Sequence, residues 1–148
     1  MYEVNPECAL EELKRADHLV YVSLKYTRTC DVILNIIKRL ITSYDLVVLE
    51  LLEYAKSNDI IKEIPVSKQG KNKKAKDLLG NQAVKYFKLY DTLKKIEKAD
   101  YQKFEEFRKN VTLLTKTKPE IRVKQETLRE YFDATKEFVF LVHKYMKK

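Results

Sequence analysis

The stretch that decides the fold is residues 31–56, which read DVILNIIKRLITSYDLVVLELLEYAK and contain neither Gly nor Pro. Apolar side chains recur along it at i, i+3 and i+4 spacing, which is the repeat of one face of an α-helix. They are Val32, Ile33, Ile36, Ile37, Leu40, Ile41, Tyr44, Val47, Val48, Leu51 and Leu52. The pattern predicts a helix of about 25 residues, ~37–40 Å long at 1.5 Å per residue.

Three leucines of this stretch, Leu34, Leu46 and Leu49, add apolar surface outside that stripe. A helix this apolar either lies at the centre of a bundle or shares one face with a second subunit. Exposed apolar patches larger than a few hundred Å² commonly mark interfaces. We therefore expect a homodimer, with these leucines as candidate interface residues.

A helical pattern precedes this stretch. Asn5, Pro6 and Glu7 form a helix start, with Asn5 as N-cap and Pro6 at the first helical position. Apolar residues then recur from Leu10 to Leu24. Residues 20–26 also alternate, so a strand is locally possible, but the uninterrupted repeat before them favours a helix. A break follows at residues 27–29, where Thr27, Thr29 or Asp31 can cap the next helix.

Residues 57–59 end the long helix, and Pro65 and a Lys-rich stretch follow as a loop with a turn at Gly70. We expect a short helix over 71–79 that ends at Gly80, then a helix over 82–98 with Val84 facing inward, and a joint at residues 99–100. Residues 101–110 carry Phe104 and Phe107 on one side. The β-branched segments 111–115 and 120–123 predict a small hairpin or extended excursion. A last helix covers about 125–145.

These segments predict an all-α fold, an antiparallel up-and-down bundle of four long helices plus a short one, with a small extended or hairpin excursion near 111–123. The 148 residues are expected to form a single domain over 1–148. Two glycines in the whole chain argue against Rossmann, P-loop and all-β barrel folds, which need tight turns.

Composition also suggests the compartment and the cofactors. No signal peptide and no membrane span are recognised, so we expect a soluble cytoplasmic protein. Cys8 and Cys30 are expected to be buried free thiols. Neither His18 nor His143 has metal-ligand spacing with other residues, so we expect no metal and no cofactor.

Positive charge is concentrated in the second part of the chain. Residues 1–60 have a net charge of −3 and residues 61–148 a net charge of +11, within a total of +8. Such a basic half can attract phosphate backbones by releasing counterions, and it can equally be a solvated Lys-rich surface. Candidate contacts in the densest basic stretch are Lys71, Lys73, Lys74 and Lys76. Tyr86 and Tyr90 lie among lysines, where rings either stack on bases or line a core.

Two polar clusters lie at the expected joints between helices. Lys25 and Arg28, with hydroxyls around them, precede the long helix, and an anion can bind at a helix N-terminus. Arg108 and Asn110 form the second cluster. Each set can also serve only to cap helix ends. A single pocket joining Arg108 with Lys25 and Arg28 is a further expectation.

The order of these parts resembles the HEPN superfamily, helical bundles found with nucleotidyltransferases in prokaryotes. The resemblance rests on residues 104–110, FEEFRKN, taken as the end of the third main helix, and on Leu128, Tyr131 and the run TKEFV at 135–139. It implies a relationship to metal-independent ribonucleases, commonly dimers, whose Arg and His meet across the dimer. Arg108 and Asn110 match the start of the family's Arg-Asn…His motif.

The motif histidine is missing, because Leu113 and Leu114 occupy its expected region. The general acid/base is therefore absent, and the resemblance implies a noncatalytic module that binds RNA, a nucleotide or a partner protein such as a nucleotidyltransferase. Two alternatives remain open: a ribonuclease with a non-standard site around Arg108, and a scaffold that only dimerises.

Overall fold

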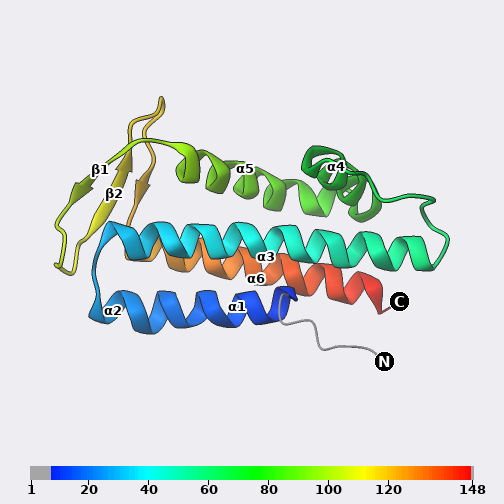
Figure 1. Ribbon diagram of the computed structural model, residues 1–148, viewed down its shortest axis with the longest axis horizontal. Coiled ribbons are helices and arrows are strands. Elements are labelled where there is room, and N and C mark those ends of the chain that lie inside the picture. Colours follow the sequence, from blue (N-terminus) through cyan, green and yellow to red (C-terminus); the bar gives the residue numbers. More distant parts are fainter. Residues whose placement is uncertain (1–7, 148) are drawn as a thin grey trace.

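The computed structural model describes residues 8–147, and it confirms the antiparallel helical bundle. The helices are α1 (Ala9–His18), α2 (Leu24–Tyr26), α3 (Cys30–Ser57), α4 (Lys68–Leu79), α5 (Val84–Lys98) and α6 (Gln125–Met146). The strands are β1 (Tyr101–Phe104), β2 (Thr112–Thr115) and β3 (Arg122–Val123). Successive long helices run in opposite directions (Figure 1). The expected helix start at Asn5 and Pro6 lies outside the described residues.

Helix α3 occupies the centre of the bundle and packs against α1, α4, α5 and α6. Its bounds match the predicted 31–56 closely. The Thr29 hydroxyl accepts a hydrogen bond from the Val32 amide at 3.2 Å and so caps the first turn. Thr29 is one of the three caps that the sequence predicted. Ile36, Ile37 and Leu40 are fully buried, because neighbouring helices cover several sides of α3.

The first helical segment contains one irregular turn. Residues Leu19–Ser23 form a π-helical turn that joins α1 to α2, so the segment is helical throughout and the strand alternative for residues 20–26 is wrong. Its buried apolar positions are Ala9, Leu13, Ala16, Val20 and Leu24. Leu10, the first residue of the apolar repeat, is 41% exposed, because the inward side of this helix passes through Ala9 and Leu13.

The Lys-rich stretch is more helical than expected. Helix α4 begins at Lys68 and includes Gly70, which was predicted to lie at a turn in a loop. Ser67 explains the difference, since its hydroxyl accepts the Gly70 amide at 3.0 Å and caps the helix three residues earlier. The helix ends at Gly80 as predicted, with φ 82 at that glycine.

Helix α5 follows a short 3-10 turn, Asn81–Ala83, and buries one face on α3. Val84, expected to face inward, is 40% exposed because it stands at the first residue of the helix, beside the buried Ala83. Phe87, Leu93 and Ile96 are buried as the helical repeat predicts. The 3-10 turn thus takes the inward position that the sequence assigned to α5 itself.

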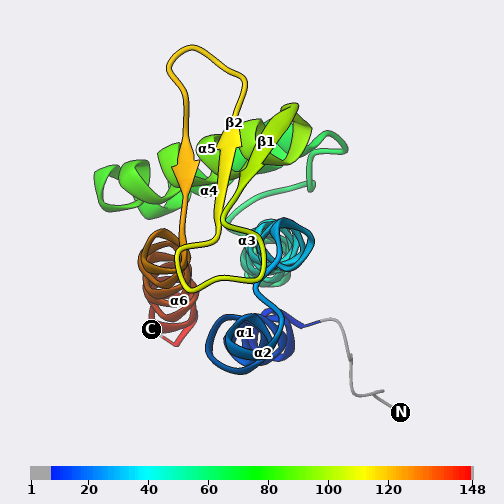
Figure 2. The ribbon, with the colours of Figure 1, turned by 90° about the vertical axis from the view of Figure 1, so that its left-hand side faces the viewer.

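The family resemblance assumed that residues 104–110 are the end of a helix. In the structure, residues 101–110 do not continue α5. Helix α5 ends at Lys98, and 101–104 form strand β1, which pairs antiparallel with β2 in the register Lys103↔Leu113. Strand β2 pairs in turn with β3, which confirms the hairpin near 111–123 and adds a third strand to it. A turn over residues 105–111 then crosses the end of the bundle (Figure 2).

Glu50, toward the C-terminal end of α3, links α3 to α1 and α6. Its Oε2 accepts the Ala9 amide at the start of α1 at 2.8 Å, and its Oε1 lies 2.8 Å from His143 Nε2 on α6. The carboxylate therefore caps α1 from another element, where the positive end of the helix dipole stabilises it. Among residues 8–147, no helix is long and apolar enough to cross a membrane.

Candidate nucleic-acid interface

The basic half of the chain folds into one layer of the molecule. Helices α4 and α5 and the small sheet lie on one side of α3, and α1 lies on the opposite side (Figures 1 and 2). We call residues 68–124, which form α4, α5, the strands and their connections, the basic layer. It contains 17 Lys and Arg against 7 Asp and Glu, a net charge of +10, while the rest of the chain has a net charge of −2. The charge asymmetry in sequence thus becomes an asymmetry between this layer and the other described residues, 8–67 and 125–147, whose net charge is −1.

Few of these charges are neutralised inside the fold. Within residues 8–147, only Lys68 and Lys94 of the basic layer form ion pairs with carboxylates, with Asp45 and Glu97 respectively. Both contacts involve partly exposed groups, which contribute little to stability. The remaining cations of the layer therefore project a positive field into solvent, where a polyanion gains most from meeting it.

Two hollows open along α5. One, of about 590 Å³, lies between α5 and the turn that joins β2 to β3, and its basic lining residues are Lys95, Lys98 and Lys118. The other, also about 590 Å³, lies at the start of α5 and includes Lys85 and Lys88. The two lysine pairs are ten residues apart, or about 15 Å along the helix axis. At 3.6 residues per turn the pairs also lie about 80° apart around the helix, so a chain of phosphates that contacts both has to wind around α5.

The candidate lysines of α4 belong to this layer, but at the end farther from the sheet (Figure 1). Lys73 and Lys76 are exposed, and Lys71 and Lys74 are partly buried. Lys76 also lies over the Phe87 ring, 5.4 Å from its centroid. Its ammonium thus makes a cation–π contact and remains on the surface.

The two predicted polar clusters are brought together at the sheet end of the bundle. The Phe107 amide donates to the Arg28 carbonyl at 2.6 Å, so the turn before α3 contacts the turn that contains Arg108. Arg108, Asn110 and Lys25 are exposed, and Arg28 is partly buried. The structure thus joins these clusters to each other and separates them from the lysines of α4, which lie at the opposite end.

Glu106 fixes this junction. Its Oε2 accepts the Cys30 amide at 2.6 Å, so it caps the N-terminus of α3 from the turn that follows β1. The Cys30 thiol is fully buried and donates to the Thr112 carbonyl at 3.3 Å. Burial, with smaller contributions from Glu106, raises the pKa of this thiol to about 11, so it stays protonated and unreactive at neutral pH. Cys8, also expected to be buried, is only partly so.

The tyrosines of α5 belong to the core. Tyr86 and Tyr90 are 8% and 5% exposed, so the core alternative holds and neither ring is free to stack on a base. Their hydroxyls donate to Glu137 at 3.0 Å and to Asp45 at 2.8 Å. In both cases burial is the largest cause that raises the pKa of the phenol, and the neighbouring carboxylate adds to it.

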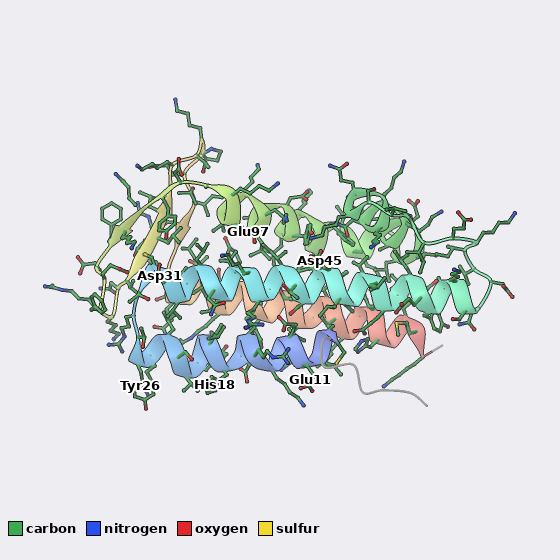
Figure 3. The ribbon with its side chains drawn as sticks, in the orientation of Figure 1. Glu11, His18, Tyr26, Asp31, Asp45 and Glu97 are labelled. Carbon is green, nitrogen blue, oxygen red and sulfur yellow. The ribbon has the colours of Figure 1, made fainter. Side chains whose placement is uncertain are left out.

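Neither histidine reaches the Arg108 turn. His143 is paired with Glu50 on the opposite half of α3, and His18 projects from α1 (Figure 3). Residues 8–147 contain no group of three or more His, Cys, Asp or Glu that could hold a metal ion. The exposed side chains next to Arg108 in sequence are cationic, aromatic and acidic: Lys109, Phe107 and Glu105.

The charged cluster of Glu12, Arg15 and Arg39 was not predicted from the sequence. Glu12 is 4% exposed, and its Oε1 accepts from Arg15 at 2.6 Å and from Arg39 at 3.2 Å, which links α1 to α3. The two arginines, with His18, line a hollow of about 390 Å³ on the side of the bundle away from α5. No signal in the sequence pairs Arg39 with Glu12, because the residues are 27 positions apart.

Lys95, Lys98 and Lys118 also escaped the sequence analysis, because they fall outside the densest lysine stretch. Their signal was present only as the excess of lysine over residues 61–148.

Comparison with known proteins gives no match: no family model, no curated protein and no solved structure matches this chain.

Proposed function

We propose that this protein is a noncatalytic, HEPN-like helical bundle that binds RNA through its basic layer. The observation that carries the proposal is the net charge of +10 on residues 68–124, against a net charge of −1 on the other described residues, 8–67 and 125–147. Lysines contact phosphates and not base edges, so the binding is weakly sequence-specific and salt-dependent. The HEPN resemblance implies RNA as the polyanion, but its segment at 104–110 is a strand end and a turn and not the end of a helix, so the charge of the layer carries the proposal.

The alternative, a ribonuclease with a non-standard site around Arg108, has less support. The motif histidine is absent from the sequence, and the described histidines lie away from Arg108. A partner protein, including a nucleotidyltransferase, is compatible with the RNA function and is proposed only as an additional contact. We also propose that the protein acts in the cytoplasm, where RNA is its accessible polyanion.

Salt dependence of RNA binding is the direct test. Filter retention measures the affinity for an RNA of mixed sequence over a series of salt concentrations. Replacing Lys71, Lys73, Lys74 and Lys76 by Gln should flatten the logarithmic salt slope, by roughly 0.7 for each phosphate of a single strand that the variant no longer neutralises. Arg108→Ala should weaken binding more than one lysine substitution, because a guanidinium can hold a phosphate through two hydrogen bonds.

A matched control removes four exposed lysines from the other elements: Lys14, Lys38, Lys56 and Lys144. It lowers the net charge by the same amount and should leave the salt slope unchanged. Equal effects of the two sets would show that only total charge matters and would contradict an interface on the basic layer. No binding at low salt would remove the RNA function and favour the scaffold alternative.

A further inference from the structure

The sheet end of the bundle exposes the two most exposed aromatic rings among the described residues. Tyr26, at the end of α2, is 79% exposed, and Phe107, in the turn after β1, is 75% exposed. Figure 3 shows Tyr26 pointing away from α3. Phe104, at the end of β1, is 43% exposed. Singly exposed apolar residues are common in proteins, but several exposed rings at one end of a molecule are characteristic of an interaction site.

The backbone of the turn holds Phe107 outward at an energetic cost. Phe107 has φ 67 and Glu105 has φ 56, in the left-handed region that bulky residues rarely adopt. Three backbone hydrogen bonds keep the turn in this form: Phe107 to Arg28 at 2.6 Å, Arg108 to Glu105 at 3.0 Å and Val111 to Arg108 at 3.0 Å. A strained position that also exposes an apolar ring gains nothing for stability, and such positions cluster at functional sites.

The residues next to these rings in sequence are mainly cationic. Lys25, Lys103, Arg108 and Lys109 are exposed. The Nε of Arg28 is buried and has no hydrogen-bond acceptor among the described residues. Glu105 and Asp31 are the exposed acids nearby in sequence, and the Glu106 carboxylate is occupied with the Cys30 amide. Exposed rings between cations match an unpaired nucleic acid strand, whose bases stack and whose phosphates pair with Lys and Arg.

We infer that this end of the bundle, residues 24–29 and 104–110, is a stacking site for the unpaired bases of a single-stranded nucleic acid. Phe107 and Tyr26 each stack on a base, and Arg28 and Arg108 contact the connecting phosphates. The inference rests on the proposed RNA function and deepens it, since the basic layer alone does not distinguish paired from unpaired strands. A protein partner that inserts its own side chains between the rings is the competing occupant.

The test compares single-stranded and duplex RNA on ring variants of the full chain. The probe is a fluorescein-labelled oligouridine of about 12 nucleotides, with a duplex of the same length beside it. Phe107→Asn and Tyr26→Ser remove the rings and keep the charges. Each should weaken oligouridine binding on the order of tenfold. Duplex affinity and the salt slope should stay unchanged, because the phosphate contacts remain.

Two controls separate stacking from damage to the fold. Asn tolerates the left-handed φ of residue 107, so Phe107→Asn should melt at the same temperature as the wild type or higher. Phe140→Ala removes a ring that is 51% exposed on α6, away from this end, and should leave binding unchanged. A lower melting temperature for Phe107→Asn would show that the ring is structural and would overturn the inference.

Unchanged oligouridine binding in the Phe107→Asn, Tyr26→Ser double variant would also overturn the inference, and would favour the protein partner. In that outcome salt-dependent RNA binding by the basic layer still stands. Complete absence of RNA binding by the wild type would remove the proposed function, and the stacking site with it. The two failures are therefore distinguishable in one set of titrations.

Discussion

Tyr44 places a large aromatic ring in the core and leaves its hydroxyl buried without a hydrogen-bond partner among the described residues. The residue is fully buried on α3, and its ring stacks on Phe138 with 5.0 Å between centroids and meets Tyr90 edge-on at 5.5 Å. Burial strongly raises the pKa of the Tyr44 phenol, with a smaller opposing contribution from the nearby Thr135. The aromatic contacts tie α3 to α5 and α6 at the middle of the bundle.

The raised pKa of Tyr44 predicts alkaline unfolding. In the unfolded chain the phenol ionises near its ordinary pKa of 10.0, whereas the folded chain keeps it protonated. Above pH 10 the folded state therefore binds more protons than the unfolded state, and its stability falls with pH, by up to about 1.4 kcal/mol per pH unit for this residue. In an alkaline pH titration, tyrosinate absorbance and circular dichroism should be recorded on the same samples. The absorbance should show a late phase that coincides with the loss of helix.

Tyr44→Phe is the informative variant for this prediction. It keeps the ring contacts and removes the titrating group, so the alkaline midpoint should move to higher pH. An alkaline midpoint equal to that of the wild type would show that other groups control the transition. Tyr90 has a raised pKa from burial and from Asp45, so part of the alkaline loss should persist in the variant.

The elements are bounded by local features, and Gly80 is the sharpest of them. It ends α4 with φ 82 and ψ −163, a combination that is essentially restricted to glycine. A Cβ placed there would meet no atom within 4 Å, so any cost of substitution comes from the backbone alone. The position therefore isolates the conformational contribution of one residue to the joint between α4 and α5.

Gly80→Ala should lower the free energy of unfolding by about 1–3 kcal/mol, since an L side chain at this φ and ψ is strained. Urea titration followed by circular dichroism measures the change. Asn81→Ala, at the next residue, is the control and should stay within about 0.5 kcal/mol of the wild type, as surface substitutions do. A urea midpoint for Gly80→Ala equal to that of the wild type would contradict the prediction. It would mean that the joint between α4 and α5 adopts another backbone conformation without cost.

At the scale of the whole molecule, the apolar excess of α3 is largely covered within one chain. Leu34, Leu46 and Leu49 are all partly buried, and Leu34 and Leu46 pack against the core. Of the two alternatives that the sequence left open, the structure shows α3 at the centre of a bundle. The homodimer stays a prediction, which the family resemblance also implies, and Leu49 is the candidate least involved in the core.

Sedimentation equilibrium in the micromolar range should show a dimer of the wild type. Leu49→Lys should shift it toward monomer without loss of helix, because a charge at an apolar interface is costly to desolvate. A wild type that sediments only as monomer over the whole concentration range would contradict the dimer. It would leave the RNA function untouched, since the basic layer is complete within one chain.

Local patterns in the sequence determined most of the elements. The helical repeat predicted α3 and α6 almost to their ends, Gly80 marked the end of α4, and the β-branched segments predicted the β2–β3 hairpin. These features depend on neighbours within a turn or two, so they can be read without the fold. The same limitation produced the error at residues 101–110, where Phe104 and Phe107 imitate a helical spacing.

Features that depend on residues far apart in the sequence were decided only by the tertiary structure. Strand β1 exists because β2 offers it hydrogen-bond partners, and Glu50 and Glu106 cap α1 and α3 from other elements, over 41 and 76 positions of the chain. The gathering of positive charge on one layer and the meeting of Arg28 with Phe107 arise in the same way. Which residues become neighbours depends on how α3 is surrounded by the other helices, and no local period in the sequence contains that information.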